Sequence, residues 1–320
     1  MDIWQTIPRP FFILAPMEDV TDTVFRQIIA EIGRPNLFFT EFTNVDGMFS
    51  RGESEVTKRL VFSKIEKPLI AQIWGITPEN YYKAAKEIVD MGFEGIDINM
   101  GCPQEDVIKK GACSALMNNH PLTKEIIQAT REGARKLPVS IKTRIGFKTV
   151  EIEEWLGFLL EQKLPALTVH LRTVREMSKV PAHWELMPDI VRLRNEIHKD
   201  TLLIGNGDVE SLIDAKEKVT QTGIDGVMIG RGIFHNPWLF NEKIDIQSIT
   251  LQDRLTLLSK HVALYEKIWQ GKKPYQILKK YFKIYLSGFE GANEMRQEFM
   301  LTNTPEEAKE LAARFASDNK

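Results

Sequence analysis

The stretch Ile96-Asp97-Ile98-Asn99-Met100-Gly101-Cys102-Pro103 predicts a β-strand that stops abruptly and presents a cysteine. Apolar residues at positions 96, 98 and 100 alternate with Asp97 and Asn99, and this alternation is the period of a strand. Gly101 and Pro103 then break the strand, so we expect Cys102 on the loop just past its C-terminal end. Many other polar signals in the chain fall at comparable places, just past predicted strands.

Seven further apolar stretches predict strands, and they alternate with helical patterns. Eight strands alternating with helices indicate an α/β protein with a TIM (β/α)8 barrel, whose eighth unit ends near residue 240. An open, doubly wound sheet is the alternative, which is disfavoured because no Gly-x-Gly-x-x-Gly follows the first strand. The seven strands are expected over 11–15, 37–42, 68–74, 139–144, 166–170, 202–205 and 226–229, and the helices over 22–32, 77–91, 105–117, 121–136, 150–162, 184–198 and 211–222.

The chain changes character at about residue 241, after which no strand pattern appears. Helical patterns over 250–270, 274–288 and 304–316 predict a small all-helical C-terminal domain, 241–320, after a barrel of residues 1–240. The stretch 254–283 is basic, with Glu266 as its only acid, which indicates either a nucleic-acid contact or a solvated helix face. The basic residues are Arg254, Lys260, Lys267, Lys272, Lys273, Lys279, Lys280 and Lys283.

Composition narrows the class of protein. With 43% apolar and 27% charged residues among 320, the chain is typical of a soluble globular protein with a sizeable core. The net charge of −2 gives no global sign of a nucleic-acid binder, although a local basic patch remains open. The two cysteines, Cys102 and Cys113, argue against a disulfide framework and indicate a reducing cytosol. Without a signal-peptide pattern or an apolar run of about 18 residues, we expect a cytoplasmic protein with no membrane span.

The active site of such a barrel lies at the C-terminal ends of its strands. Glycine-rich turns after the seventh and eighth strands, Asn206-Gly207-Asp208 and Gly230-Arg231, would let backbone N–H groups approach a phosphate. Their alternative role is only to make tight turns. The residues that the other strands place at this end are Ala15, Pro16, Met17, Gln72, Asn99, Cys102, Lys142, Arg144, His170 and Arg172.

Several of these side chains need a partner if they are buried. Lys142 and Arg144 point to the barrel side, where a buried lysine is costly unless it meets an anion or an electron-rich ring. Gln72 lies between apolar residues and is either a functional amide or a satisfied core amide. A lone histidine such as His170 is more typical of a hydrogen-bonded structural group. No set of His, Cys, Asp and Glu has metal-ligand spacing, so we expect no metal.

Cys102 has two interpretations at this stage. Cysteine is among the most buried residue types and is often inert. Its place on a loop between glycine and proline suits instead a reactive nucleophile or a proton donor. A thiol keeps its proton near neutral pH unless its surroundings lower its pKa. Cys113, between Ala112 and Ser114 on a predicted helix, is expected to be structural.

Eight short motifs follow one another at barrel spacing: Ala15-Pro16-Met17, Val20-Thr21-Asp22, Gln72-Ile73-Trp74-Gly75, Asn99-Met100-Gly101-Cys102-Pro103, Lys142-Thr143-Arg144-Ile145-Gly146, Gly205-Asn206-Gly207-Asp208, Gly230-Arg231-Gly232 and Asn236-Pro237-Trp238. Together they resemble the tRNA-dihydrouridine synthase family, from residue 11 to about 240. Each motif alone is weak, and their common register makes the resemblance specific. The C-terminal helical part fits the tRNA-binding domain of that family in length and character.

The resemblance implies an FMN-dependent enzyme that uses NADPH to reduce the C5–C6 bond of a uridine in tRNA. Hydride would pass from flavin N5 to C6, and Cys102, as a protonated thiol outside any strongly thiolate-stabilising site, would give a proton to C5. No membrane or protein partner is implied, and a monomer is expected. The residues implied to hold FMN are Ala15, Pro16 and Met17 along the flavin, Gln72 at the isoalloxazine edge, Lys142 at N1/O2, His170 against the ring, and Asn206, Gly207, Asp208, Gly230 and Arg231 at the ribityl phosphate.

The resemblance also implies residues that bind the substrate, namely Asn99 and Arg144 at the base, with Arg172, Lys279 and Lys280 as further contacts. The sequence departs from the family pattern at Leu171 and in the loop 174–183, which predicts an altered fit to the substrate. Two other functions remain open: a flavin reductase for a free pyrimidine or another small unsaturated ring, and a tRNA-binding or folding module without chemistry. The basic helices argue against the first, and the intact Cys102 and Lys142 against the second.

Overall fold

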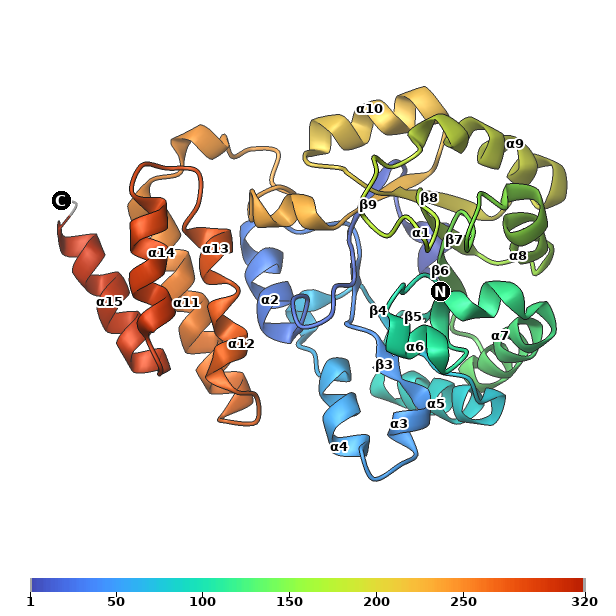
Figure 1. Cartoon of the computed structure of the whole chain (residues 1–320), viewed down its shortest axis with the longest axis horizontal. Helices are drawn as coiled ribbons and strands as arrows, with labels where there is room; N and C mark the ends of the chain where they lie inside the picture. The colour runs from blue at the N-terminus through green and yellow to red at the C-terminus, as the bar shows by residue number, and fades with distance from the viewer. Residues whose placement is uncertain (1, 319–320) are drawn as a thin grey trace.

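The computed structural model describes residues 2–318 and shows a closed parallel barrel beside a group of helices (Figure 1). The sheet runs in the order β1-β9-β8-β7-β6-β5-β4-β2, and a parallel bridge between Ile13 and Leu37 closes it. The predicted TIM barrel is therefore confirmed, and the open sheet is wrong. The strands are β1 (Phe11–Leu14), β2 (Phe38–Phe39), β3 (Thr43–Asn44), β4 (Leu69–Trp74), β5 (Gly95–Asn99), β6 (Val139–Arg144), β7 (Ala166–His170), β8 (Leu202–Asn206) and β9 (Gly226–Ile229).

The barrel helices follow the predicted order with two differences. The expected helix over 105–117 is short, α6 (Glu105–Lys109), because Gly111 and Cys113 take left-handed backbone angles that end it, and a 3-10 turn, Cys113–Asn118, follows. The expected helix over 150–162 begins with a wide π-type turn before α8 (Gly157–Glu161). The other barrel helices are α2 (Thr23–Ile32), α5 (Pro78–Met91), α7 (His120–Ala134), α9 (Met187–Ile197) and α10 (Leu212–Thr222), with the short α1 (Ile3–Thr6), α3 (Val45–Met48) and α4 (Glu53–Val56).

The interior of the barrel is apolar at its floor and polar toward its mouth. Trp4, from α1, packs below the strands at 6.1 Å from the Phe11 ring and 6.5 Å from the Phe39 ring. Above this layer, the inward positions of β4, β5 and β6 carry buried polar residues. The larger apolar cluster fills the space between strands and helices. Chemistry inside the barrel is therefore confined to its mouth, where the strands end.

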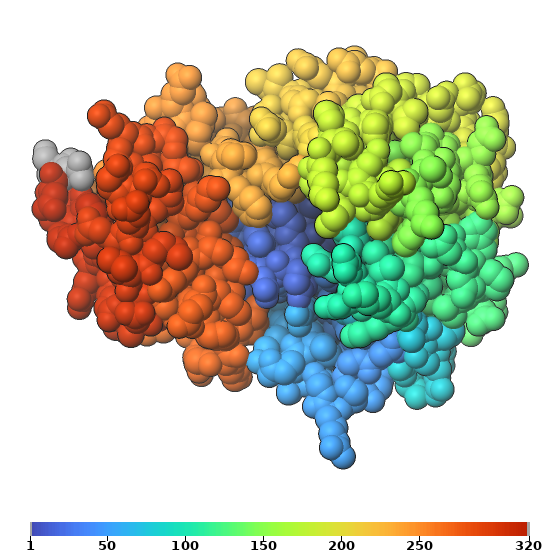
Figure 2. All heavy atoms as spheres, viewed as in Figure 1, coloured from blue at the N-terminus to red at the C-terminus, as the bar shows by residue number. Residues whose placement is uncertain are grey.

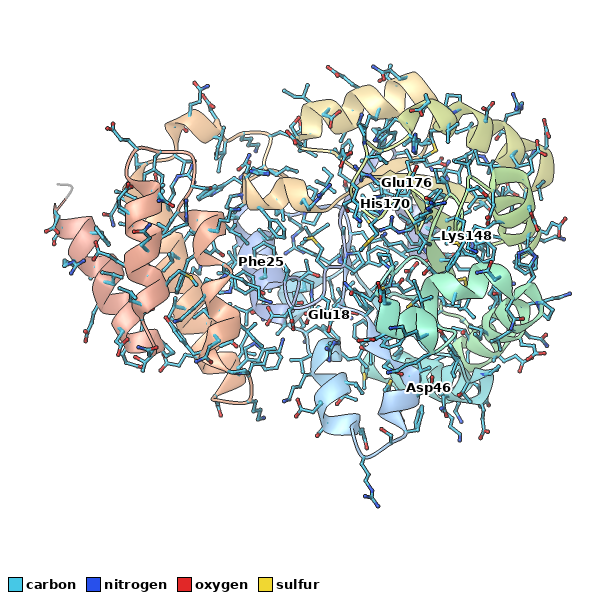
Figure 3. All side chains as sticks on the ribbon, viewed as in Figure 1. Glu18, Phe25, Asp46, Lys148, His170 and Glu176 are labelled. Atoms are coloured by element: carbon cyan, nitrogen blue, oxygen red, sulfur yellow. The ribbon has the colours of Figure 1, made fainter. Side chains whose placement is uncertain are left out.

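The C-terminal region is entirely helical over the residues described and lies against α2 (Figures 1 and 2). Phe25 of α2, labelled in Figure 3, points toward the helical region, and its ring centroid lies 5.5 Å from that of Tyr281. The helix expected over 274–288 is two short helices, and α14 was not predicted. The elements are α11 (Leu251–Trp269), α12 (Tyr275–Lys279), α13 (Phe282–Tyr285), α14 (Ala292–Leu301) and α15 (Pro305–Asp318). The division into domains at residue 240 stays a prediction. Within residues 2–318, no helix has the length and apolarity needed to cross a bilayer.

Candidate active site

Two adjoining cavities open at the barrel mouth. One, of about 690 Å³, is lined by Gln72, Asn99, Cys102 and Arg144 among others. The second, of about 430 Å³, is lined by the turns after β8 and β9. Pro16, Met17, Lys142 and His170 line both cavities, so the two form one continuous site. Every residue that the sequence proposes for the cofactor or for catalysis lines at least one of these cavities, and Figure 2 shows this face of the molecule hollowed between the barrel and the helical region.

A chain of hydrogen bonds fixes the polar groups at the base of the larger cavity. Gln72 Nε2 donates to Asp97 at 2.7 Å, and Gln72 Oε1 accepts from Asn99 Nδ2 at 3.1 Å. Ser140 Oγ also donates to Asp97 at 2.7 Å. Burial raises the pKa of Asp97 to about 6. Both ends of the Gln72 amide are thus held by protein, and Asp97, which the sequence interpretation did not single out, is the group that holds it. The alternation of residues 96–100 already placed Asp97 on the same face as Asn99.

Asn99 orients the cysteine loop. Its Oδ1 accepts hydrogen bonds from the backbone N–H groups of Gly101 at 3.0 Å and Cys102 at 3.1 Å. On the other side of the loop, Ser114 Oγ donates to the Cys102 carbonyl at 2.7 Å. The loop that begins at the end of β5 is therefore fixed at both edges, and it presents the Cys102 side chain to the larger cavity.

Cys102 is buried, with 9% of its surface exposed, yet its surroundings favour the thiolate. A hydrogen bond from the Cys113 thiol lowers the pKa of Cys102 to about 7, against the opposing effect of burial. The Gln104 N–H and the charges of Arg144 and Lys142 act in the same direction. The expectation that Cys102 lies outside any strongly thiolate-stabilising site therefore does not match these surroundings. Cys113, expected on a helix, begins a 3-10 turn instead.

Lys142 presents a cation to both cavities. Its ammonium makes no hydrogen bond or ion pair within residues 2–318, and its strand neighbour across the β5–β6 pairing is Asn99. Burial, with the nearby charge of Arg144, lowers the pKa of Lys142 to about 8. An ammonium held in a cavity at this cost is placed to meet an anion or an electron-rich ring.

Arg144 joins two loops across the mouth. Its Nε donates to the Gly101 carbonyl at 2.8 Å, and its Nη1 donates to the carbonyls of Thr173 at 3.2 Å and Met177 at 2.9 Å. Burial and the charge of Arg172 lower the pKa of Arg144 to about 10. Two of its three nitrogens are therefore engaged with backbone, and Nη2 remains for a contact with a bound molecule.

The smaller cavity carries the signs of a phosphate site. Gly207 has φ 129°, and a Cβ there would lie 2.7 Å from Ala182 Cβ, so the turn needs glycine. Asp208 accepts from Arg231 Nη2 at 2.8 Å and from Arg172, and it fixes both guanidinium groups beside the cavity. Burial opposes the ionisation of Asp208, but the bonds from Arg172 and the Ala182 N–H outweigh it and lower the pKa of the carboxyl. Arg172, expected at the substrate, lies here with the glycine turns.

His170 lies between the two cavities as a neutral ring. Burial, followed by the charges of Arg144 and Lys142, lowers its pKa well below the usual range. Its Nε2 lies 3.2 Å from Arg172 Nη1, and because a guanidinium only donates, Nε2 accepts and the proton is on Nδ1. The uncharged imidazole offers a flat surface to whatever occupies the cavity.

Lys279 and Lys280 lie away from both cavities. Lys279 Nζ donates to the Met300 carbonyl at 2.8 Å, and Lys280 pairs with Asp19 at 3.6 Å. Lys273, from the same basic stretch, is largely buried against Asp22 at 3.3 Å. Many of the basic residues of this stretch therefore make contacts within the helical region or between that region and the barrel.

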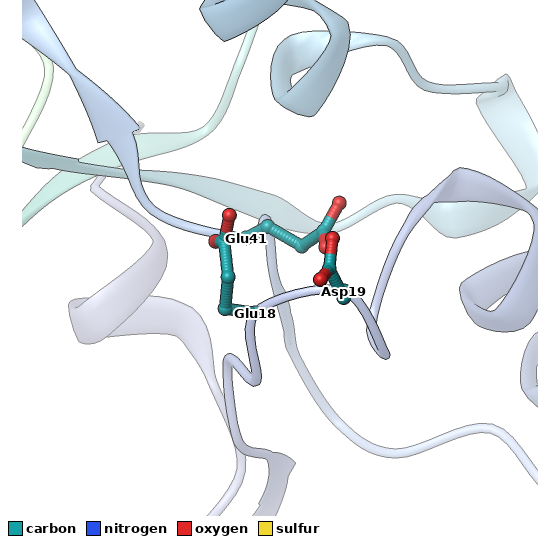
Figure 4. A group of neighbouring side chains, drawn as sticks. All are labelled: Glu18, Asp19 and Glu41. Carbon is teal, nitrogen blue, oxygen red and sulfur yellow. The ribbon is translucent and has the colours of Figure 1, made fainter. Parts of the chain in front are cut away.

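Three carboxylates missed by the sequence interpretation meet where the barrel faces the helical region: Glu18, Asp19 and Glu41 (Figure 4). Their oxygens lie within 4.8 Å of one another, a spacing that could hold a cation. Each already faces a basic side chain: Glu18 pairs with Arg59, Asp19 with Lys280, and Glu41 with Lys273 at 3.7 Å. Burial raises the pKa of Glu41 to about 7. The group is an ion-pair network at the edge of the larger cavity.

Comparisons with known proteins find similarity over nearly the whole chain. The family model for dihydrouridine synthase (Dus) matches residues 13–319. A probable tRNA-dihydrouridine synthase of Staphylococcus aureus (strain MRSA252) is 46% identical over 317 residues, which cover 98% of this chain and 95% of that protein. The probable tRNA-dihydrouridine synthase 2 of Bacillus subtilis (strain 168) is 45% identical, with 98% and 96% covered.

Solved structures share the fold at low sequence identity. Morphinone reductase aligns with a TM-score of 0.51 at 14% identity, over 75% of this chain and 86% of that one. A 2-naphthoyl-CoA reductase complex aligns with a TM-score of 0.57 at 10% identity, over 72% and 49% of the two chains. The family match and the two relatives, together with the geometry at the barrel mouth, identify the chain as a member of the dihydrouridine synthase family.

Proposed function

We propose that this protein reduces the C5–C6 double bond of uridines in tRNA to give 5,6-dihydrouridine. The names of its relatives support the reaction and the substrate. One observation carries the proposal: the Cys102 thiol, with a pKa of about 7, and the unpartnered ammonium of Lys142 line the same cavity. That cavity adjoins the one formed by the glycine-rich turns, which suits an anion. A reductase of this bond needs all three: a proton donor, a cationic contact for an electron-rich cofactor ring, and a place for that cofactor's phosphate.

The residues present fit FMN. The free ammonium of Lys142 suits the N1/O2 edge of the ring, and neutral His170 suits its face. Gly207, Gly230 and Arg231 suit the ribityl phosphate, because the glycine turns leave their backbone open to the smaller cavity. When bound, the flavin supplies the hydride for C6 of the base, with NADPH as the source of the electrons. Gln72, whose amide is already hydrogen-bonded at both ends, positions the neighbouring Asn99 and holds the base of the cavity.

Cys102 supplies the proton that balances the reaction. Addition of a hydride at C6 and a proton at C5 saturates the bond. When Cys102 gives up this proton, its sulfur becomes a thiolate. The Gln104 N–H and the charge of Lys142 stabilise that thiolate, and solvent restores its proton before the next turnover. A proton donor works best with a pKa near the working pH, which is where these neighbours place Cys102.

The target base reaches this cavity only after it leaves its stack in the RNA. A cavity of about 690 Å³ accommodates a nucleobase beside the cofactor ring. Arg144 Nη2, which is free of the loop contacts, is placed to bond a carbonyl of the base. Lys110 also lines the cavity and would offer positive charge to the phosphates of the flipped nucleotide, whereas Arg59, which lines it too, is paired with Glu18.

The experiment that tests the proposal is to map dihydrouridine by mass spectrometry in tRNA from a strain that lacks this gene. Complementation with the wild-type gene should restore the modification, and complementation with Cys102→Ala should not. The Cys102→Ala protein should still be yellow and should still bind tRNA, which separates loss of the proton donor from loss of the fold. No missing dihydrouridine in the deletion strain, or a colourless protein that FMN cannot reconstitute, would contradict the proposal.

A further inference from the structure

The loop after β7, residues 171–183, is a closed loop at the barrel mouth. Its two ends are bonded to each other, because the backbone N–H of its last residue, His183, donates to the carbonyl of its first residue at 2.8 Å. One side of the loop supplies the two carbonyls, those of Thr173 and Met177, that accept from Arg144 Nη1. The position of Arg144 at the larger cavity therefore depends on how this side of the loop is fixed.

Glu176 fixes the turn that carries these two carbonyls. Its Oε2 accepts from the Thr173 N–H at 2.7 Å, and its own N–H donates to Thr173 Oγ1 at 3.3 Å. The two residues thus bond each other in both directions, as the capping residues at a helix N-terminus do. These bonds set the direction of the backbone over 173–177, and Arg144 Nη1 bonds a carbonyl from each end of that segment.

His183 holds the other oxygen of Glu176. Its Nε2 lies 3.0 Å from Glu176 Oε1, and its Nδ1 lies 3.0 Å from Glu185 Oε1. An ionised carboxylate only accepts, so both ring nitrogens donate and the ring is an imidazolium. The bond to Glu176 raises the pKa of His183, and Glu185 acts in the same direction. Burial opposes the ionisation of Glu176, but its bonds to Thr173 and His183 outweigh this effect and lower its pKa.

We propose that Glu176 and His183 are positioning residues for the substrate base: His183 holds Glu176, and Glu176 fixes the turn 173–177, whose carbonyls hold Arg144. Neither Glu176 nor His183 lines either cavity, so both act on the base only through Arg144, which does. A displacement of about 1 Å in a positioning group can cost about 100-fold in rate, so the fixing of Arg144 bears directly on turnover. The inference rests on the proposed function for the base that Arg144 meets, whereas the bonds that hold Arg144 belong to the folded chain.

The test is a double-mutant cycle. The measured quantity is the rate at which the reduced holoenzyme converts uridine to dihydrouridine in unmodified tRNA within a single turnover. His183→Leu removes both ring donors and should slow this rate by about tenfold. In an Arg144→Lys background the same change should slow it by less than about twofold, because lysine lacks the forked group that bonds the turn and the base together. A residue that only stabilises the fold would cause the same loss in both backgrounds.

Three variants separate the bonds from the fold. His183→Gln keeps a side-chain donor toward Glu176 and should retain most of the wild-type rate. Glu176→Ala breaks the next bond of the series and should show the same dependence on Arg144, so the test stands even if His183→Leu folds poorly. His198→Leu is the matched control, because His198 also bonds through Nδ1, to Thr201 Oγ1 at 2.9 Å, but precedes β8 at the opposite end of the barrel. It should change the rate by less than about twofold in both backgrounds.

A second measurement needs neither tRNA nor turnover. Phenylglyoxal modifies guanidinium groups, and its rate at Arg144 in the holoenzyme is read from the modified peptide by mass spectrometry. This rate should rise severalfold in His183→Leu and Glu176→Ala, because the loop no longer holds Nη1, and should stay at the wild-type value in His198→Leu.

Equal losses of tRNA reduction in the two backgrounds, or an unchanged modification rate at Arg144 in both His183→Leu and Glu176→Ala, would overturn the inference. A wild type that forms no dihydrouridine, with faster modification of Arg144 in the two variants, would refute the proposed reaction and leave the hold of Glu176 and His183 on Arg144 intact.

Discussion

The replacement Asn99→Ala tests how the cysteine loop is held. In the folded protein Asn99 Oδ1 accepts from the N–H groups of Gly101 and Cys102, and its Nδ2 donates to Gln72 Oε1. Alanine leaves two backbone donors and one amide oxygen without partners in a buried layer. A buried group that loses its partner costs about 1–3 kcal/mol, and water from the adjoining cavity can satisfy some of them. We therefore expect the free energy of unfolding to fall by about 2–4 kcal/mol.

The assay pairs urea unfolding with the alkylation of Cys102. Asn44→Ala is the matched control, because Asn44 Oδ1 also accepts from two backbone N–H groups, those of Asp46 at 2.8 Å and Gly47 at 3.1 Å. Asn44 is the N-cap of α3, and none of these bonds reaches the cysteine loop. Its loss should cost about 1 kcal/mol, as for other N-caps, and leave the alkylation of Cys102 unchanged. Asn99→Ala should instead raise the alkylation rate at pH 9, because the freed loop exposes the sulfur.

Equal destabilisation by the two substitutions, with the same alkylation rate in both, would refute the reasoning. It would mean that the carbonyl contact from Ser114 holds the loop without help from Asn99.

Three further predictions concern the cavity and the junction with the helical region. The pKa of Lys142 is lower in the folded protein than in the unfolded chain, so the unfolded chain binds that proton more tightly. The free energy of unfolding of the wild type, relative to that of Lys142→Met, should therefore rise between about pH 8 and pH 10. Urea titrations that give the same difference at every pH would contradict this prediction. Lys273→Met leaves buried carboxylates without their cation and should cost about 3–5 kcal/mol in urea unfolding, whereas Lys283→Met, at an exposed lysine, should cost little. Gly207→Ala should abolish the flavin absorbance of the purified protein, whereas Gly223→Ala, at another left-handed glycine with open space around it, should keep the colour and lose about 1 kcal/mol of stability.

The sequence was sufficient to predict the barrel because the information is local. Alternating residues such as 96–100 and 139–144 mark strands, and the polar residues just past them mark the mouth. The family match confirms the resemblance drawn from these motifs. The roles of single residues at the mouth stay predictions, although the structure gathers all of them but Lys279 and Lys280 around two cavities.

The parts that the sequence did not predict depend on contacts between distant segments. The bond from Gln72 to Asp97 follows from the register of β4 against β5, which no local pattern specifies. The helix expected over 105–117 ends at Lys109, just before the left-handed Gly111, and Cys113 takes a second left-handed angle although it is not glycine. Lys273 has the sequence surroundings of an RNA-binding lysine, and only the folded chain shows it buried against Asp22.

The junction between the barrel and the helical region has a mechanical consequence. Trp269 Nε1 donates to Asp22 at 3.0 Å, Tyr281 donates to the Val20 carbonyl at 2.6 Å, and Lys273 lies over the Trp269 ring at 4.2 Å. These contacts hold the segment from the end of α11 to the start of α13 against the loop after β1, which also lines the larger cavity. These contacts therefore hold the surface of the helical region at a set distance from Cys102. A macromolecule that docks on both meets a surface formed in advance, so it spends no binding energy on closing two domains.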